Sequence, residues 1–399
     1  MPYVLGVDVG TTRTAVAVCR TDGAGRAEPD VPLPAVPSAL RLTPTGRIAV
    51  GEAGEPLVTA TGFARRVGDP TPFALGRELC PPEELTALVV RWAVDRVTGH
   101  EGIPPEHVVL THPMSWTGHT RAVMLAALRE AGVDRVTLLA EPLAVAENHA
   151  FRHGAVGCLA VFGLGGTSSS AAAVRAGAVE RWSEDLEPVA GEDFDDLIAS
   201  HVRAVLGREF EDADYALLRH ACEAAKRALS AGPSTVVPVH LPTGVAEVAL
   251  TRTRFEDLVR PAVEHAVALL ARTVRGLPVD VTVLVGGSAR IPLIATLVPG
   301  RVVVEAAPEL AAVRGAALHG RRVLLGDVEP EPRETSVLAR DDPSLRFPVG
   351  AADQDDDFTA PPPRPPVDIV PLELPVRRTV GRVVRDLASV GRRATGEDR

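Results

Sequence analysis

The sequence predicts an α/β fold made of two related lobes. Helical and strand-like periodicities alternate along most of the chain, and one strand–turn–strand motif occurs twice. The length of 399 residues, with 46% hydrophobic and 24% charged side chains, suits one large or two medium-sized globular domains. We therefore expect a first lobe over residues 1–152 and a second lobe over residues 153–328.

The first lobe is expected to begin with a β-hairpin and to continue as alternating helices and strands. Strand-like runs at 3–8 and 14–19 flank a polar turn, whereas residues 31–82 are rich in Pro and Gly and predict loops with short elements. Beyond them, periodicity predicts helices at 83–97, 117–131 and 141–151, and strands at 108–111 and 136–139.

The second lobe repeats this alternation, with a two-strand insertion expected at 236–250. A glycine pair, Gly286 and Gly287, leads into a further helix near Arg290. Apolar runs predict strands at 157–162, 170–174 and 281–285, and helical periodicity predicts helices at 192–206, 215–229, 254–275 and 310–325.

The composition changes beyond residue 329. An acidic run at 353–357 and a Pro-rich run at 361–366 cannot bury enough apolar area to offset the entropy of ordering, so residues 329–399 are expected to be disordered. Within them, residues 376–393 form a short basic amphipathic segment. This segment could bind a protein partner, lie on an anionic membrane surface, or contact the acidic run of its own chain.

Charge and composition argue against several classes of protein. The formal net charge of −10 gives no overall basic field, so nucleic acid is not expected as a main partner. The four cysteines are far apart and indicate neither a disulfide framework nor a zinc site. No secretory signal begins the sequence, and no run approaches the roughly 20 apolar residues of a transmembrane segment. We expect a cytoplasmic protein, peripheral to the membrane if its basic segment binds lipid.

The repeated motif is LGVDVGTT at residues 5–12 and AVFGLGGT at residues 160–167. In each copy an apolar strand runs into a turn of Gly and hydroxyl residues. Glycine allows close approach of the backbone, and clustered N–H groups with hydroxyls suit the oxygens of a phosphate chain. One such turn alone would indicate an ordinary hairpin, but the pair favours phosphate binding across a cleft. The predicted phosphate contacts are Gly10, Thr11, Thr12, Gly165, Gly166, Thr167 and Ser168.

These hairpins resemble the two phosphate loops of the seventy-kilodalton heat-shock chaperone family, within the actin and sugar-kinase superfamily. Further segments are similar to family motifs in the same order, over roughly residues 3–325. They are the connecting motifs at 111–116 and 139–146, the element GEDFD at 191–195, and the adenosine-contacting segments at 222–230 and 285–292. The resemblance implies an actin-like ATPase fold, in which a ribonuclease H-like lobe is duplicated, with ATP or ADP and Mg²⁺ in the cleft.

The resemblance also assigns roles to two carboxylates. Asp8 matches an aspartate that holds hydrated Mg²⁺ on the phosphates, in keeping with the preference of this ion for oxygen ligands. Glu141 matches a glutamate near the hydrolytic water. The alternative roles are a turn cap for Asp8 and a charge that complements the helix dipole for Glu141. Both residues are therefore candidate catalytic groups, and Asp8 is also the candidate metal contact.

For the adenosine moiety, Glu223, Lys226 and Arg227 fall on one helix face at positions i, i+3 and i+4. A surface ion pair is the alternative interpretation of this pattern. Glu309 stands where the family usually has Asp. The full set of adenosine contacts implied by the resemblance is Gly191, Glu192, Glu223, Lys226, Arg227, Ser230, Gly286, Gly287, Ser288, Arg290 and Glu309.

Three features depart from the family pattern. The second phosphate loop has Gly163 where the family has a carboxylate that helps to hold hydrated Mg²⁺, and a second carboxylate of that motif is also missing. No catalytic lysine is identifiable, and the nearest candidates are Arg65 and Arg66, which cannot deliver a proton as lysine can. The sequence after residue 325 does not resemble the peptide-binding β-sandwich of the family. We therefore expect ATP binding with weak or absent hydrolysis.

The leading functional hypothesis is a chaperone-related protein that acts as a nucleotide-dependent conformational switch. One alternative is a sugar or metabolite kinase of the same superfamily, which would need a carboxylate base deep in the cleft. Another is an actin-like structural or scaffold protein, although the long charged tail does not favour filament packing.

Overall fold

The structure is a computed structural model of the chain. It describes residues 1–22, 27–44, 46–51, 58–185, 189–210, 212–242 and 244–326, apart from the side chains of residues 212 and 213. The predicted disordered tail at 329–399, with its basic segment at 376–393, lies outside the described residues. Among the helices that are described, none is long and apolar enough to cross a membrane.

The first half is built on a five-stranded sheet in the order β10-β9-β1-β2-β3. Strand β1 pairs antiparallel with β2 and parallel with β9, so the predicted hairpin forms the centre of the sheet. The helices α1 (Pro82–Glu101) and α2 (Gly118–Glu130) cover one face. The strands are β1 (Tyr3–Val9), β2 (Arg13–Arg20), β3 (Val36–Pro37), β9 (His107–His112) and β10 (Val136–Ala140).

Alternation along β1 explains how this sheet is covered on both faces. Tyr3, Leu5 and Val7 join the core under α1 and α2, whereas Val4 faces the opposite side. On that opposite side lies α8 (Ala311–Leu325), and a Cβ at Gly6 would press against its backbone. The small residue at position 6 therefore permits close packing of helix on strand.

Short elements extend the first half, as the Pro- and Gly-rich composition predicts. The strands β4 (Ala39–Leu42), β5 (Ile48–Val50) and β6 (Val58–Thr61) form a three-stranded sheet. A hairpin of β7 (Phe73–Leu75) and β8 (Glu78–Cys80) follows the 3₁₀ helix η1 (Phe63–Arg66). Their apolar side chains share a core with α1.

The second half repeats the topology of the first. Its sheet has the order β13-β12-β11-β16-β17, with β11 antiparallel to β12 and parallel to β16. This is the same arrangement as in the first sheet, which confirms the predicted duplication. The strands are β11 (Cys158–Leu164), β12 (Ser169–Arg175), β13 (Ala178–Glu184), β16 (Val281–Val285) and β17 (Val302–Val304).

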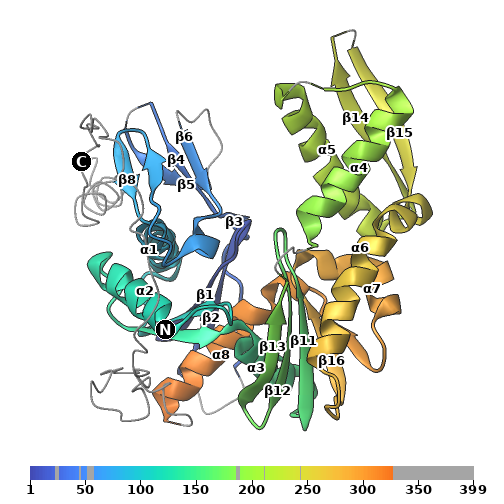
Figure 1. Ribbon diagram of the computed structural model, residues 1–399. Coiled ribbons are helices and arrows are strands. Elements are labelled where there is room, and N and C mark those ends of the chain that lie inside the picture. Colours follow the sequence, from blue (N-terminus) through green and yellow to red (C-terminus); the bar gives the residue numbers. More distant parts are fainter. Residues whose placement is uncertain are drawn as a thin grey trace, which may run out of the picture.

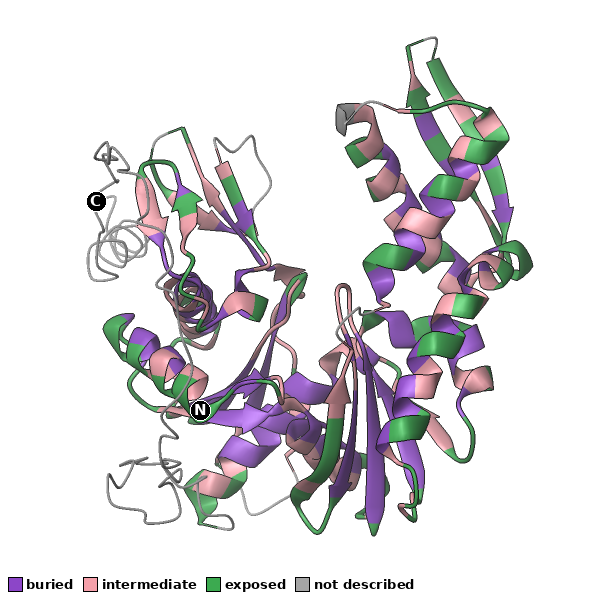
Figure 2. Cartoon of the chain, viewed as in Figure 1, coloured by how far each residue is buried: buried purple, intermediate pink, exposed green. Residues whose placement is uncertain are grey.

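Helices and one hairpin complete the second half around its own core (Figures 1 and 2). The hairpin of β14 (Ser234–Leu241) and β15 (Gly244–Thr251) is the predicted insertion. The helix expected near Arg290 is split into the 3₁₀ turn η2 (Gly287–Arg290) and α7, because Pro292 starts the second piece. The remaining helical elements are α4 (Gly191–Leu206), α5 (Asp212–Ala231), α6 (Arg252–Thr273), α7 (Pro292–Leu297) and η3 (Pro308–Leu310).

Two helices join the halves at their base (Figure 1). The helix α3 (Glu141–His153) follows β10 of the first sheet but packs against the second sheet, whereas α8 packs on the first sheet. The two helices also contact each other, and a Cβ at Gly315 would overlap the carbonyl oxygen of Ala144. The halves are therefore linked through one close helix–helix contact.

Candidate nucleotide site

The two predicted phosphate turns have the same backbone geometry. In the first, the amide of Gly10 donates to the carbonyl of Arg13 at 3.0 Å. In the second, the amide of Gly165 donates to the carbonyl of Ser168 at 2.9 Å. A Cβ at Gly166 would overlap the side chain of Thr12, so the turns from the two halves meet. The two turns that the sequence repeat predicts to bind phosphate therefore lie next to each other, one from each half, with Thr12 against Gly166.

The second turn presents a hydroxyl that lacks a partner. The Oγ1 atom of Thr167 is buried and has no hydrogen-bond partner within the described part of the chain. The Arg65 guanidinium, from η1 of the first half, donates to the carbonyl of Thr167 at 2.7 Å. A buried hydroxyl and a cation next to two Gly-containing turns fit the oxygens of a phosphate chain.

Several predicted adenosine residues form hydrogen bonds with the second turn or with the residues that contact it. The carbonyl of Gly165 accepts from the Gly191 amide at 3.0 Å and from Ser288 Oγ at 3.1 Å. Lys226 Nζ donates to the carbonyl of Gly191 at 2.7 Å and to Asp195 Oδ2 at 2.8 Å. The first turn of α4, η2 and α5 are therefore tied to one phosphate turn.

Gly286 occupies a conformation that only glycine adopts without strain. Its φ is 88°, and a Cβ there would overlap the carbonyl oxygen of Leu164. The backbone of the predicted adenosine segment can therefore lie directly against β11. Gly287 beside it has open space around it.

The other predicted adenosine residues form local contacts. Glu223 and Arg227 make an exposed i, i+4 ion pair with a shortest N···O distance of 3.6 Å. Arg290 donates two hydrogen bonds to the carboxylate of Glu309, at 2.8 and 3.1 Å. Ser230 Oγ donates to a carbonyl of its own helix. The roles of these residues, and of Glu192, in binding adenosine remain predictions.

Asp8 is the last residue but one of β1, close to the first turn. Its Oδ1 atom accepts a hydrogen bond from Thr111 Oγ1 at 2.6 Å, and burial raises the pKa of this carboxyl above its ordinary value. A carboxylate next to a phosphate turn suits Mg²⁺, which prefers carboxylate and water oxygens. The residues present therefore fit a hydrated cation at this position.

Glu141 is the first residue of α3 and faces the same region. Burial, followed by the charges of Asp8 and Glu184, raises the pKa of Glu141 to about 7. A carboxyl that titrates near neutral pH can accept or release a proton under physiological conditions.

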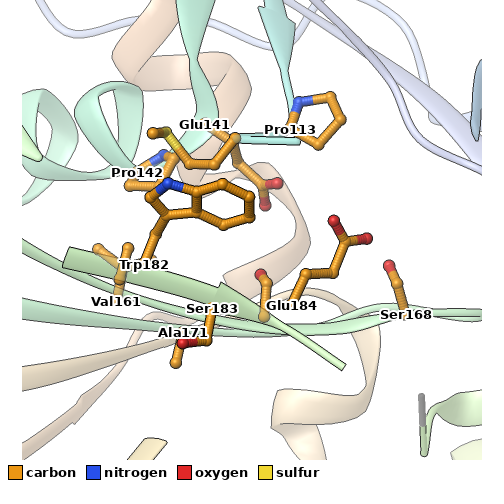
Figure 3. A pocket seen from close by; sticks show the side chains of 12 residues that line it. Pro113, Glu141, Pro142, Val161, Ser168, Ala171, Trp182, Ser183 and Glu184 are labelled. Atoms are coloured by element: carbon orange, nitrogen blue, oxygen red, sulfur yellow. The ribbon is translucent and has the colours of Figure 1, made fainter. Parts of the chain in front are cut away.

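Glu184 was not predicted from the sequence. It is the last residue of β13, an edge strand that the periodicity analysis missed, and it lines a cavity together with Glu141 and Ser168 (Figure 3). A signal was present, because Ala176 and Gly177 have φ values of 50° and 78° and form the two-residue turn between β12 and β13. An X-Gly pair between two strand-like runs is typical of such a hairpin.

The chain matches one known family over most of its length. The family profile described as Hsp70 protein matches residues 73–333. The chain belongs to the Hsp70 family. A chaperone protein HscA homolog of Azotobacter vinelandii strain DJ is 30% identical over an alignment that covers 82% of this chain and 60% of that protein.

Two further relatives agree with this membership. The HscA homolog of Pseudomonas putida strain KT2440 is 30% identical, and that of Methylibium petroleiphilum strain PM1 is 28% identical. Each alignment covers 82% of this chain and 60% of the relative, so the chain spans about 60% of the length of these relatives. The actin-like fold and the family expected from the sequence are confirmed.

Proposed function

We propose that the chain binds ATP or ADP with Mg²⁺ between its two turns and acts as a nucleotide-dependent conformational switch with slow or absent hydrolysis. The observation that carries the proposal is the meeting of two equivalent turns, one from each half, at Thr12 and Gly166. A ligand that contacts both turns binds with different affinity when the halves are close together and when they are apart. This difference in affinity shifts the equilibrium between the two conformations.

The turns would hold the phosphate chain. Backbone amides of both turns, with the hydroxyls of Thr11, Thr12, Thr167 and Ser168, would donate to phosphate oxygens. Asp8 would accept hydrogen bonds from the water ligands of Mg²⁺, which supplies positive charge to the phosphates when it is bound. The contacts of Gly191 and Ser288 with Gly165 would pass a shift of the second turn to α4 and η2.

Movement between the halves would occur about the base. The helices α3 and α8 pack against opposite sheets and against each other at Gly315, so they form the covalent and packed connection between the halves. The hydrogen bond from Arg65 to Thr167 crosses between the halves close to the phosphate site. Nucleotide that displaces or reinforces this bond would bias how closely the halves approach.

Weak hydrolysis is proposed because positioned groups of the family pattern are absent from this sequence. Gly163 contributes no carboxylate, and a Cβ at this position would lie 2.6 Å from Ser170 Oγ. Arg65 is one of the two nearest candidates for the family's catalytic lysine, and an arginine side chain does not deliver a proton as lysine can. Removal of one positioned group commonly slows such a reaction by about a hundredfold or more.

Calorimetric titration with ATP, ADP and a non-hydrolysable analogue in the presence of Mg²⁺, paired with single-turnover hydrolysis, tests this function. We expect binding of all three nucleotides and slow or undetectable turnover. Asp8→Asn should weaken binding in the presence of Mg²⁺, whereas the control Asp134→Asn, at an exposed position, should not. No binding by the wild-type chain, or turnover as fast as that of an ordinary chaperone ATPase, would contradict the proposal.

The basic segment at 376–393 is proposed as an accessory contact site for a protein partner or an anionic membrane surface. Co-sedimentation with anionic vesicles, compared with a variant truncated after residue 329, tests the membrane contact. Equal sedimentation of both chains would contradict it.

A further inference from the structure

A small cavity lies between the acidic residues of the two halves. It has a volume of about 50 Å³ and is lined by Glu141 from α3, Ser168 from the second phosphate turn and Glu184 from β13. Figure 3 shows the carboxyl groups of Glu141 and Glu184 directed into the same space. Much of the lining is apolar, but the cavity is large enough for water, and its carboxylate and hydroxyl groups offer hydrogen-bond partners to a water molecule. Two carboxylates would repel a phosphate group but accept hydrogen bonds from water.

The position of Glu184 follows from the register of the sheet. Gly163 in β11 pairs with Ser170 in β12, and Ser170 pairs with Glu184 in β13. Directly paired residues of neighbouring strands point to the same face of a sheet. The carboxylate of Glu184 therefore stands on the face that a side chain at position 163 would occupy, two strands away.

We propose that Glu184 is a catalytic residue that binds and orients the water that attacks the terminal phosphate of bound ATP. The inference rests on the proposed nucleotide site and on hydrolysis there that is slow rather than absent. The cavity borders Ser168, so water held there lies next to the phosphate turn, and Glu184 compensates in part for the missing carboxylate at Gly163.

The reaction is an ordinary hydrolysis. The water oxygen forms a bond to the terminal phosphorus while the bond from this phosphorus to the bridging oxygen breaks, and ADP leaves with the electron pair of that bond. Glu184 accepts a hydrogen bond from one water proton, and Glu141 accepts the other proton and passes it to solvent. Because the pKa of Glu141 is raised to about 7, this carboxyl can both accept and release a proton near neutral pH.

Two substitutions on the same strand test the role. Glu184→Gln removes the charge in the cavity, whereas the control Glu180→Gln removes a charge from an exposed ion pair with Arg175. We expect Glu184→Gln to slow single-turnover hydrolysis at least about tenfold with little change in ATP affinity, as for the loss of a positioned group. Glu180→Gln should leave the rate unchanged. Glu184→Asp keeps the charge but shortens the side chain, and its rate should lie between the two.

A second readout needs no nucleotide. Carbon NMR of the Glu141 carboxyl in the nucleotide-free protein should show a lower pKa in Glu184→Gln than in the wild type, because a neighbouring negative charge is removed. It should show no such change in Glu180→Gln.

The outcomes separate the two proposals. If the wild type binds ATP but the rate is the same in Glu184→Gln, or if the Glu141 titration does not move, the role of Glu184 is overturned and the nucleotide site stands. Binding without any measurable hydrolysis by the wild type also overturns that role. If the wild type binds no nucleotide, the proposed function fails and the role of Glu184 falls with it.

Discussion

The carboxyl group of Glu141 makes the folded protein less stable as the pH rises, and its replacement tests the electrostatics of the site. Its pKa rises from an ordinary value of 4.5 to about 7 in the folded chain. Between these two values the folded state binds more protons than the unfolded state, so the free energy of unfolding falls with increasing pH. A shift of this size corresponds to about 3 kcal/mol, and partial exposure of the side chain reduces the expected effect to about 1–2 kcal/mol.

Glu141→Gln removes the ionisable group and keeps the size of the side chain. We expect the variant to be about 1–2 kcal/mol more stable than the wild type at pH 8, and the gain to shrink to about a quarter of this value at pH 5. Urea unfolding of the nucleotide-free chain, followed by tryptophan fluorescence, measures the difference. The control Glu264→Gln, at an exposed position of α6, should show no such pH dependence. A gain that is equal at both pH values would refute the reasoning.

Three further substitutions probe the contacts around the site. Lys226→Met leaves the carboxylate of Asp195 buried without its ion-pair partner and should cost about 3 kcal/mol of stability at pH 8 in urea unfolding; an unchanged midpoint would contradict the pairing. Gly315→Val forces α3 and α8 apart and should cost about 2 kcal/mol in the same assay, whereas an unaffected midpoint would mean that the helices are not tightly packed. Arg65→Ala removes the cation hydrogen-bonded to Thr167 and should weaken ATP binding about tenfold, and ADP binding less, by calorimetry; equal losses would argue against a contact with the terminal phosphate.

Much of the fold could be predicted because its elements carry strong local signals. The helices α1, α4, α5 and α6 fall where helical periodicity places them, within a few residues at each end. The strand β16 matches its predicted range of 281–285, because a buried parallel strand is a continuous apolar run. The duplication was visible because both turns need the same glycine and hydroxyl residues.

The strand β13 was missed for a physical reason. It is an edge strand whose side chains are mostly half-buried or exposed, so it lacks the alternation of apolar and polar residues that marks a half-buried strand. A bulge at Ala173 and Val174 also interrupts its pairing with β12. Trp182 and Glu184 lie on this strand, and periodicity alone therefore did not predict their contribution to the cavity, although the Ala176-Gly177 pair marked the turn that precedes it.

The packing of α3 and α8 on the sheet of the opposite half likewise could not be predicted from the sequence pattern. Periodicity predicts that α3 and α8 are helices, but not that each packs against the sheet of the other half. Such packing depends on tertiary contacts, in particular on the small residues Gly6 and Gly315, which allow backbones to meet. The sequence next to each glycine does not show which other element of the fold that glycine contacts.

The distance between the outer parts of the two halves, measured with and without nucleotide, tests the proposed switch most directly. Spin labels can be attached through Arg77→Cys, in the turn between β7 and β8, and Val245→Cys, in β15, since both positions are exposed and the four native cysteines are buried. Pulsed electron resonance should show a shorter and narrower distance distribution with saturating ATP and Mg²⁺, and no change when Asp8→Asn is added. Identical distributions with and without nucleotide, at concentrations where calorimetry detects binding, would contradict a nucleotide-dependent switch.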